Sequence, residues 1–296
     1  MFDILVVPLD GSEPAEAALA IAELIPSQRV RLLTVEFDAQ VPMLGDAPAW
    51  EVWRAERERE GQTYLERMAE PLRRQGRAVE TIFEFGNPAD LIVGVAADAD
   101  LIVMGSHGRG GGDRVLFGSV ADRVARHATC PTLIVRGGER PAVAPPLSRL
   151  VVPLDGSLFA ERALPTATAL AAVLGLPIHL VRVFDFDALR ATVQAGIHAA
   201  TAYAQSQEAI RRQGEEYLAT QAQRLRNRDL TATSELRIGP PAAELLEAVR
   251  TGDLIVLTTH GRGGIRRWLL GSVAEKLVRL APAPVLLVRP EQVTNG

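Results

Sequence analysis

The stretch VVPLDGS at residues 6–12 returns unchanged at residues 151–157. Its apolar start reads as the end of a buried strand, and its Asp-Gly-Ser reads as a turn that leads into a helix. Further strings recur downstream in the same order in both halves: HGRGG at 107–111 and 260–264, and GSV at 118–120 and 271–273. The chain of 296 residues therefore consists of two copies of one unit, each long enough to bury its own core.

A segment rich in glycine and proline separates the two copies. Residues 137–148 read GGERPAVAPPLS, and the apolar pattern lapses there. We predict a first domain over residues 1–137, a linker over 138–148 and a second domain over 149–290.

Apolar runs alternate with amphipathic or charged runs along each copy. The apolar runs that we predict as strands lie at 3–8, 30–36, 78–85, 100–105 and 131–136 in the first copy, and near 149–153, 178–183, 230–237, 253–258 and 284–289 in the second. Strands that are apolar throughout, with helices between them, are typical of a parallel sheet covered on both faces. The predicted fold class is α/β, with two tandem doubly wound parallel-sheet domains of five strands each.

The segment after the fourth predicted strand, residues 105–119, reads GSHGRGGGDRVLFGS. Glycines let a ligand approach the main chain, and the free amides at a helix start attract anions. The pattern predicts a phosphate site at the carboxyl end of that strand. An alternative stays open, because Ser119 with Asp122, and Ser272 with Glu275, also fit a capping box that would merely start a helix.

Composition excludes several classes of protein. The net charge of −4 argues against a general nucleic-acid binder. No apolar run approaches the ~20 residues that span a bilayer, so we expect no membrane partner. The start of the chain lacks the basic region of a secretory signal, and one cysteine excludes an internal disulfide framework. We expect a cytoplasmic protein.

The spacing Gly105-x2-Gly108-x9-Gly118-Ser119 resembles the ATP-binding signature G-x2-G-x9-G-S/T of the universal stress protein family. The opening VPLDGS and the closing CPTLIV at 130–135 resemble that family's first and last strands. The resemblance covers both copies outside the linker and two insertions, at 37–49 and 184–205. It identifies the chain as a tandem member of the ATP-binding subtype, with the adenine-nucleotide alpha-hydrolase-like fold.

The resemblance also implies a set of binding residues. Adenine would lie against the main chain at the ends of the first two strands, the aspartate of the turn would approach ribose or a metal-bound phosphate, and the glycine loop would surround the triphosphate. In the first copy these residues are Pro8, Leu9, Asp10, Val35, Gly105, Gly108, Arg109, Gly118, Ser119 and Val120. In the second copy they are Pro153, Leu154, Asp155, Val183, Thr258, Gly261, Arg262, Gly271, Ser272 and Val273. The implied cofactors are ATP and Mg²⁺ bound with it.

The second copy departs from the signature at one position. Thr258 stands where the first copy has Gly105. A β-branched side chain is stiffer and bulkier there, and it either narrows the phosphate approach or donates its hydroxyl to a phosphate oxygen. The aspartates also have an ordinary interpretation, since Asp-Gly at residues 10–11 and 155–156 favours turns.

Two other functions stay open at this point: a slow ATPase or nucleotidyl-transfer enzyme of the same architecture, and a nucleotide-free dimeric scaffold. His107 and His260 lie in the glycine loops, but neither has a histidine or cysteine at metal-ligand spacing. Ser106, His107 and Asp10 would be the members of a hydrolytic triad, yet the G-x-S-x-G pattern is missing. We expect no catalytic residue and at most weak ATP hydrolysis.

The remaining expectations concern packing and partners. Similar proteins dimerise through the last strand, so we predict an internal pseudo-dimer in which 131–136 pairs with 284–289, and a homodimer of chains. A helical stripe of Trp50, Trp53, Tyr64, Met68 and Leu72 reads as core or partner surface. We interpret Cys130, before Pro131, as a buried thiol rather than a redox centre.

Overall fold

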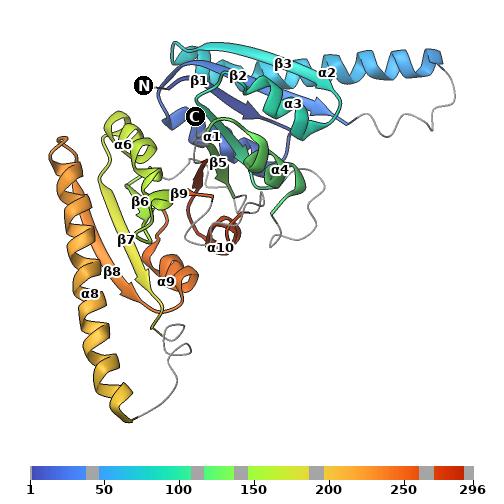
Figure 1. The fold of residues 1–296 in the computed structure, drawn as a ribbon. Coiled ribbons are helices and arrows are strands. Elements are labelled where there is room, and N and C mark those ends of the chain that lie inside the picture. Colours follow the sequence, from blue (N-terminus) through green and yellow to red (C-terminus); the bar gives the residue numbers. More distant parts are fainter. Residues whose placement is uncertain are drawn as a thin grey trace, which may run out of the picture. The chain divides into compact units, whose positions relative to one another are not determined.

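The computed structural model describes residues 2–37, 47–107, 117–136, 146–186, 197–259 and 270–289. They fall into two units, Met1–Ala144 and Pro145–Gly296, and each is considered separately below. Figure 1 shows that strands and helices alternate along the chain in both units.

The first unit is a five-stranded sheet with helices between the strands. Its elements in chain order are β1 (Phe2–Pro8), α1 (Glu13–Leu24), β2 (Ser27–Glu36), α2 (Ala47–Arg74), β3 (Ala78–Phe85), α3 (Pro88–Val95), β4 (Leu101–Gly105), α4 (Ser119–His127) and β5 (Thr132–Val135). The strand order is β3-β2-β1-β4-β5, and all pairs are parallel. The order reverses between β1 and β4, which makes their carboxyl ends the expected place for a ligand.

Both faces of this sheet are covered. Helix α1 packs against β1, β4 and β5, and α2 packs against β2 and β3. Helices α3 and α4 pack against each other on the opposite face, as right-handed crossovers require. The fully buried side chains of the central strands, such as Leu5, Leu32 and Ile102, explain why these strands are apolar throughout.

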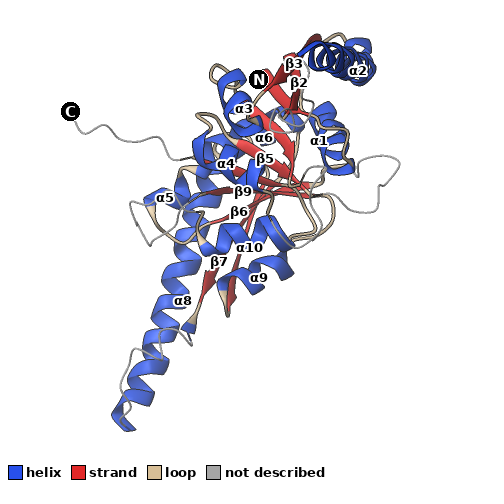
Figure 2. Ribbon diagram, turned by 90° about the vertical axis from the view of Figure 1, so that its right-hand side faces the viewer, coloured by secondary structure: helices blue, strands red, loops and turns tan. Residues whose placement is uncertain are grey.

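The second unit repeats this plan. Its elements are β6 (Arg149–Pro153), α5 (Leu158–Glu161), α6 (Ala163–Leu174), β7 (Ile178–Phe184), α8 (Ile197–Arg226), β8 (Ala232–Ile238), α9 (Pro241–Ala248), β9 (Asp253–Thr258), α10 (Ser272–Leu280) and β10 (Val285–Val288). The strands pair in parallel in the order β8-β7-β6-β9-β10. Figure 2 shows α9 and α10 side by side and α8 alongside the strands. The α/β class with two doubly wound parallel sheets is confirmed.

One detail differs from the expectations, and another distinguishes the second unit from the first. Residues 197–205, which the resemblance treats as part of an insertion, form the first turns of α8. The first helix of the second unit is split at Arg162 into α5 and α6, whereas α1 is continuous over 12 residues.

Gly105 ends β4 at a place where a side chain cannot fit. A Cβ built on it would lie 2.8 Å from the carbonyl carbon of Pro14 and 2.9 Å from the amide nitrogen of Ala15, in the first turn of α1. We expect Gly105→Ala to destabilise the first unit by roughly 1–3 kcal/mol, because backbone atoms would have to move. Hydrogen exchange of β1 and β4 amides measures this loss.

Gly94 in α3 gives the matched control, since a Cβ there meets no atom within 4 Å. Gly94→Ala is expected to leave the first unit as stable as before or to add about 0.5–1 kcal/mol, as in other helices. Equal effects of the two substitutions would contradict the close approach of α1 to β4.

Candidate functional site

The amino-terminal end of α4 is held against the carboxyl end of β4 by a glycine. Gly118 is the N-cap, and its N–H donates to the Ser106 carbonyl oxygen at 2.9 Å. A Cβ on Gly118 would lie 2.6 Å from that oxygen, so no other residue allows this approach. The N-cap offers no side-chain hydrogen bond to the first amides of α4. This helix end therefore presents donors and a positive dipole to an anion.

The second unit has the same arrangement at α10. Gly271 is the N-cap without a side-chain cap, and its N–H donates to the Thr259 carbonyl oxygen at 2.8 Å. Ser119 and Ser272 are the first helical residues in the two units, and Val120 and Val273 follow them. Each unit therefore places the Gly-Ser-Val string at the start of the helix that follows its fourth strand.

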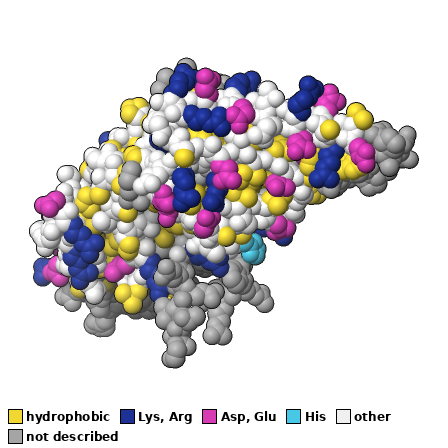
Figure 3. Space-filling view, turned by 90° about the horizontal axis from the view of Figure 1, so that it is seen from above, with side chains coloured by type: hydrophobic (Ala, Val, Ile, Leu, Met, Phe, Trp, Pro, Cys, Tyr) yellow, Lys and Arg dark blue, Asp and Glu magenta, His cyan; other side chains and the backbone are white. Residues whose placement is uncertain are grey.

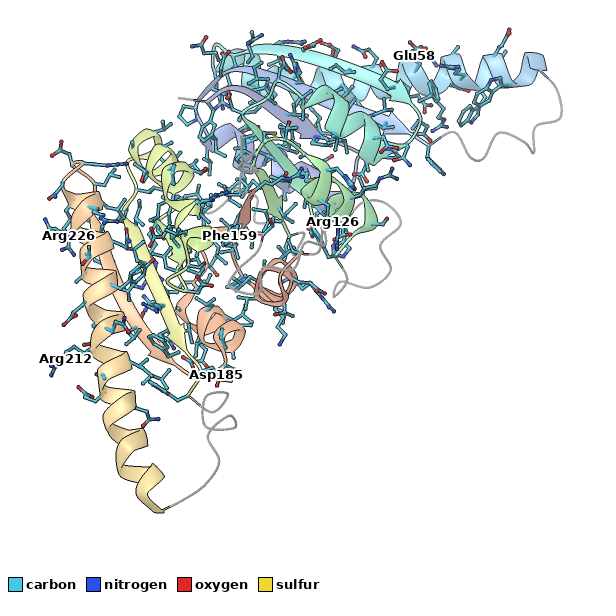
Figure 4. The ribbon with its side chains drawn as sticks, viewed as in Figure 1. Glu58, Arg126, Phe159, Asp185, Arg212 and Arg226 are labelled. Atoms are coloured by element: carbon cyan, nitrogen blue, oxygen red, sulfur yellow. The ribbon has the colours of Figure 1, made fainter. Side chains whose placement is uncertain are left out.

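The capping-box alternative is wrong. It needs a serine at the N-cap and a carboxylate that reaches back to it, but the N-caps are glycines. The Asp122 carboxylate instead accepts from Arg126 of the next turn at 2.8 and 2.7 Å, and Figure 4 labels Arg126 on α4. Glu275 likewise accepts from Arg279 at 3.3 Å.

The turn after the first strand is built around an aspartate in both units. Asp10 accepts from the backbone N–H and the hydroxyl of Ser12, at 3.0 and 2.5 Å, and Gly11 takes a φ of 76°. Asp155 accepts from the N–H and the hydroxyl of Ser157, at 2.9 and 2.6 Å. The turn interpretation of these aspartates is confirmed, and each turn lies at the carboxyl edge of its sheet.

The main chain between the first two strands is closely bonded. Leu9 donates its N–H to the Leu33 carbonyl at 2.7 Å, and its own carbonyl accepts from the Thr34 hydroxyl at 2.8 Å. Pro8 ends β1, and Val35 is the last residue but one of β2. In the second unit Pro153 ends β6, the Leu154 N–H donates to Val181 at 2.8 Å, and Val183 lies in β7.

The predicted residues divide into two groups. Those at strand ends and helix starts lie along the carboxyl edge of their own sheet: Pro8, Leu9, Asp10, Val35, Gly105, Gly118, Ser119 and Val120 in the first unit, and Pro153, Leu154, Asp155, Val183, Thr258, Gly271, Ser272 and Val273 in the second. Gly108, Arg109, Gly261 and Arg262 lie outside the described residues, as does His260.

Ser106 and His107 form a neighbouring pair at the end of β4. The Ser106 hydroxyl lies 3.0 Å from His107 Nδ1, and Ser106 is buried. Burial, together with the positive charge of Arg136, lowers the pKa of His107 below its usual value, so the ring is neutral at pH 7. The third member of the imagined triad, Asp10, directs a carboxylate oxygen to Ser12 instead.

Metal binding by side chains alone has no support in the described part of the chain. No group of three or more His, Cys, Asp or Glu side chains is arranged there to hold an ion. Mg²⁺ commonly takes oxygen ligands from the phosphates of a bound nucleotide together with one or two carboxylates.

Cys130 is buried, with its sulfur 3.8 Å from the Ala96 carbonyl oxygen, and burial raises the thiol pKa to about 11. Below that pH the thiol stays protonated, so we expect native protein at pH 8 to resist Ellman's reagent and urea-unfolded protein to react at once. Reaction of the native thiol should rise only as pH approaches the raised pKa. Rapid stoichiometric labelling at pH 8 would contradict a buried, inert thiol.

Comparison with known proteins supports the resemblance. The family model described as the universal stress protein family matches residues 1–136 and 146–289. A universal stress protein of Mycobacterium tuberculosis is 26% identical over 295 residues, 96% of each chain. One of Mycolicibacterium smegmatis is 30% identical over 219 residues, which cover 73% of this chain and 70% of the relative.

A solved structure agrees in fold over the whole chain. The crystal structure of a universal stress protein from Archaeoglobus fulgidus matches with a TM-score of 0.69 and 21% identity, covering 97% of this chain and 98% of that one. The tandem α/β arrangement is therefore shared with a protein of distant sequence.

Proposed function

The chain belongs to the universal stress protein family, with one family domain in each half, and we propose on that premise that it is an ATP-binding regulator of the stress response. The observation that supports this most is the start of α4, where Gly118 brings uncapped amides against the end of β4. The proposed ligand is ATP with Mg²⁺, and the proposed location is the cytoplasm.

The residues present fit a triphosphate. The amides after Gly118 and the exposed Ser119 hydroxyl would donate to phosphate oxygens, while the Asp10 turn and the ends of β1 and β2 lie where adenosine would lie. Each charge-assisted hydrogen bond contributes roughly 1.5–3 kcal/mol. A few such bonds with a buried base reach micromolar affinity, about −8 kcal/mol. A bound nucleotide would supply phosphates and their Mg²⁺, and these would hold together the loops that follow the first and fourth strands.

We favour a binding protein over an enzyme. Phosphoryl transfer needs metal clamps and a group that positions the nucleophile. Ser106 is buried, and His107 is turned to it through Nδ1. A nucleotide-dependent change at another surface is the simpler use of such a site.

The proposed partners are an adenine nucleotide and a second copy of the chain. Strands β5 and β10 are each an edge strand in the order of their own unit. A pseudo-dimer through the last strands would require this. No helix in the described ranges combines the length and the apolar character needed to cross a bilayer. The face in Figure 3 carries acidic and basic side chains intermixed, and with a net charge of −4 this offers little to nucleic acid.

Two measurements on full-length protein test the proposal. Protein purified without added nucleotide is denatured, and the released small molecules are identified by mass spectrometry; adenine nucleotide is expected. The same protein is titrated with a fluorescent ATP analogue, and turnover is followed in the same sample. No binding at millimolar nucleotide would favour the scaffold, and product release above about 1 s⁻¹ would favour the enzyme.

A further inference from the structure

The two units differ at a residue that lies at the same place in both sheets. Leu9 donates to Leu33 in the first unit as Leu154 donates to Val181 in the second. The next residue in each second strand is therefore equivalent, and it is Thr34 in β2 and Arg182 in β7.

The side chains of Thr34 and Arg182 extend in different ways at the ends of their strands. Thr34 is short and buried, and its hydroxyl folds back onto the Leu9 carbonyl at 2.8 Å. Arg182 is also buried, and its guanidinium reaches across to the turn that follows β6. A Cβ built on Gly156 would lie 2.8 Å from Nη2 and 3.1 Å from Cζ of Arg182.

Aromatic rings hold the guanidinium there. Its Cζ lies 4.6 Å from the centre of the Phe184 ring and 4.8 Å from that of Tyr217. Contacts of this kind between a cation and an aromatic ring are attractive, and more so where water is excluded. The guanidinium is thus placed between the turn, β7 and α8.

Both rings are themselves fixed. The Tyr217 hydroxyl donates to Glu161 Oε1 at 2.9 Å, and Gln221 donates to the same oxygen at 3.1 Å. A Cβ on Gly214 of α8 would lie 2.6 Å from the Phe184 ring, so helix and ring are in close contact. The two rings that contact Arg182 are thus held by contacts with α5 and α8.

The two units also differ at the end of their fourth strands. Thr258 fills the position of Gly105, where a Cβ in the first unit would collide with the start of α1. In the second unit the helix at this place is α5, which ends after four residues; Figure 4 labels Phe159, its second residue. The contact between the end of the fourth strand and the helix that follows the first strand thus also differs between the units.

We propose that Arg182, with Thr258, closes the second crevice to adenosine, so that each chain binds one adenine nucleotide, in its first unit. This rests on the proposed function, which puts adenosine between the turn after the first strand and the end of the second. In the second unit the Arg182 guanidinium lies against the turn that follows β6, whereas in the first unit the Thr34 hydroxyl stays on the Leu9 carbonyl.

Nucleotide stoichiometry tests the proposal. Full-length protein is titrated with ATP and Mg²⁺ in a calorimeter, and one site per chain is expected. Arg182→Thr, alone or with Thr258→Gly, is expected to raise this to two. Thr34→Arg carries the block into the first unit and is expected to lower it to zero. Arg211→Thr, at an exposed arginine of α8, is the control for loss of charge and should keep one site.

A second measurement shows which unit is occupied. Photo-crosslinking with 2-azido-ATP, followed by peptide mass spectrometry, should label only peptides from residues 1–144 of the wild-type chain. Labelling of both units, or a wild-type stoichiometry of two, overturns the inference and leaves the proposed function standing. A folded Arg182→Thr, Thr258→Gly variant that still binds one nucleotide overturns the role of these residues. No binding to any variant is the distinct failure of the proposed function itself. Circular dichroism shows whether each variant is folded. If the Arg182 variants do not fold, the stoichiometry of the folded Thr34→Arg variant tests the proposal instead.

Discussion

A Gly118→Val chain is expected to bind ATP at least about a hundredfold more weakly than the wild type. The valine Cβ would stand 2.6 Å from the Ser106 carbonyl oxygen, so the start of α4 has to move off the end of β4. Two charge-assisted hydrogen bonds lost at about 1.5 kcal/mol each correspond to this factor. The measurement is a titration with a fluorescent ATP analogue.

The same substitution also strains the fold, by roughly 1–3 kcal/mol. Ser119→Ala separates the two effects, because the Ser119 side chain is exposed and its removal disturbs no packing. We expect it to leave stability within about 0.5 kcal/mol and to weaken ATP binding roughly tenfold or more. Unchanged binding in both variants would remove α4 from the site.

Much of the fold could be predicted because its signals are local. The repeated VVPLDGS places a strand end and a turn, and the structure has them at Pro8 and Pro153, each followed by an Asp-Gly turn. Asn87 before Pro88 predicts a helix start, and the Asn87 side chain does accept from the amides of Ala89 and Asp90. Continuous apolar runs predict buried parallel strands, which is what β4 and β9 are.

The candidate site was less predictable, because contacts between distant segments decide it. The capping box at Ser119 follows the sequence rule, but the contact of Gly118 with Ser106 makes the glycine the N-cap. The burial of Arg182 could not be predicted from the sequence, because a charged residue in a strand usually lies on a solvated face. Its ring partner Tyr217 comes from a helix far along the chain, and only the unequal pair Thr34 and Arg182 hints at the difference.

Asp253→Ala is expected to destabilise the second unit by about 3 kcal/mol. Asp253 is buried at the start of β9, where Arg149 donates to both carboxylate oxygens at 2.9 Å and the Arg250 N–H donates at 2.8 Å. Removing the carboxylate leaves the largely buried Arg149 guanidinium and a backbone donor without this partner. Breaking a buried pair on one side costs about 3–5 kcal/mol, and the partial exposure of Arg149 places the effect at the lower end.

The first unit supplies the matched control. Asp100 precedes β4 as Asp253 begins β9, but it is exposed, and among the described residues it accepts from the backbone amides of Asp3 and Ile4, at 2.6 and 3.0 Å. Asp100→Ala is expected to cost about 1 kcal/mol, since water replaces part of what is lost. Hydrogen exchange of the full chain, measured for each peptide, separates the two units. Asp253→Ala is expected to speed exchange in β6 and β9, and Asp100→Ala in β1 and β4. Equal losses would mean that burial of the Arg149 pair adds nothing to the stability of the second unit.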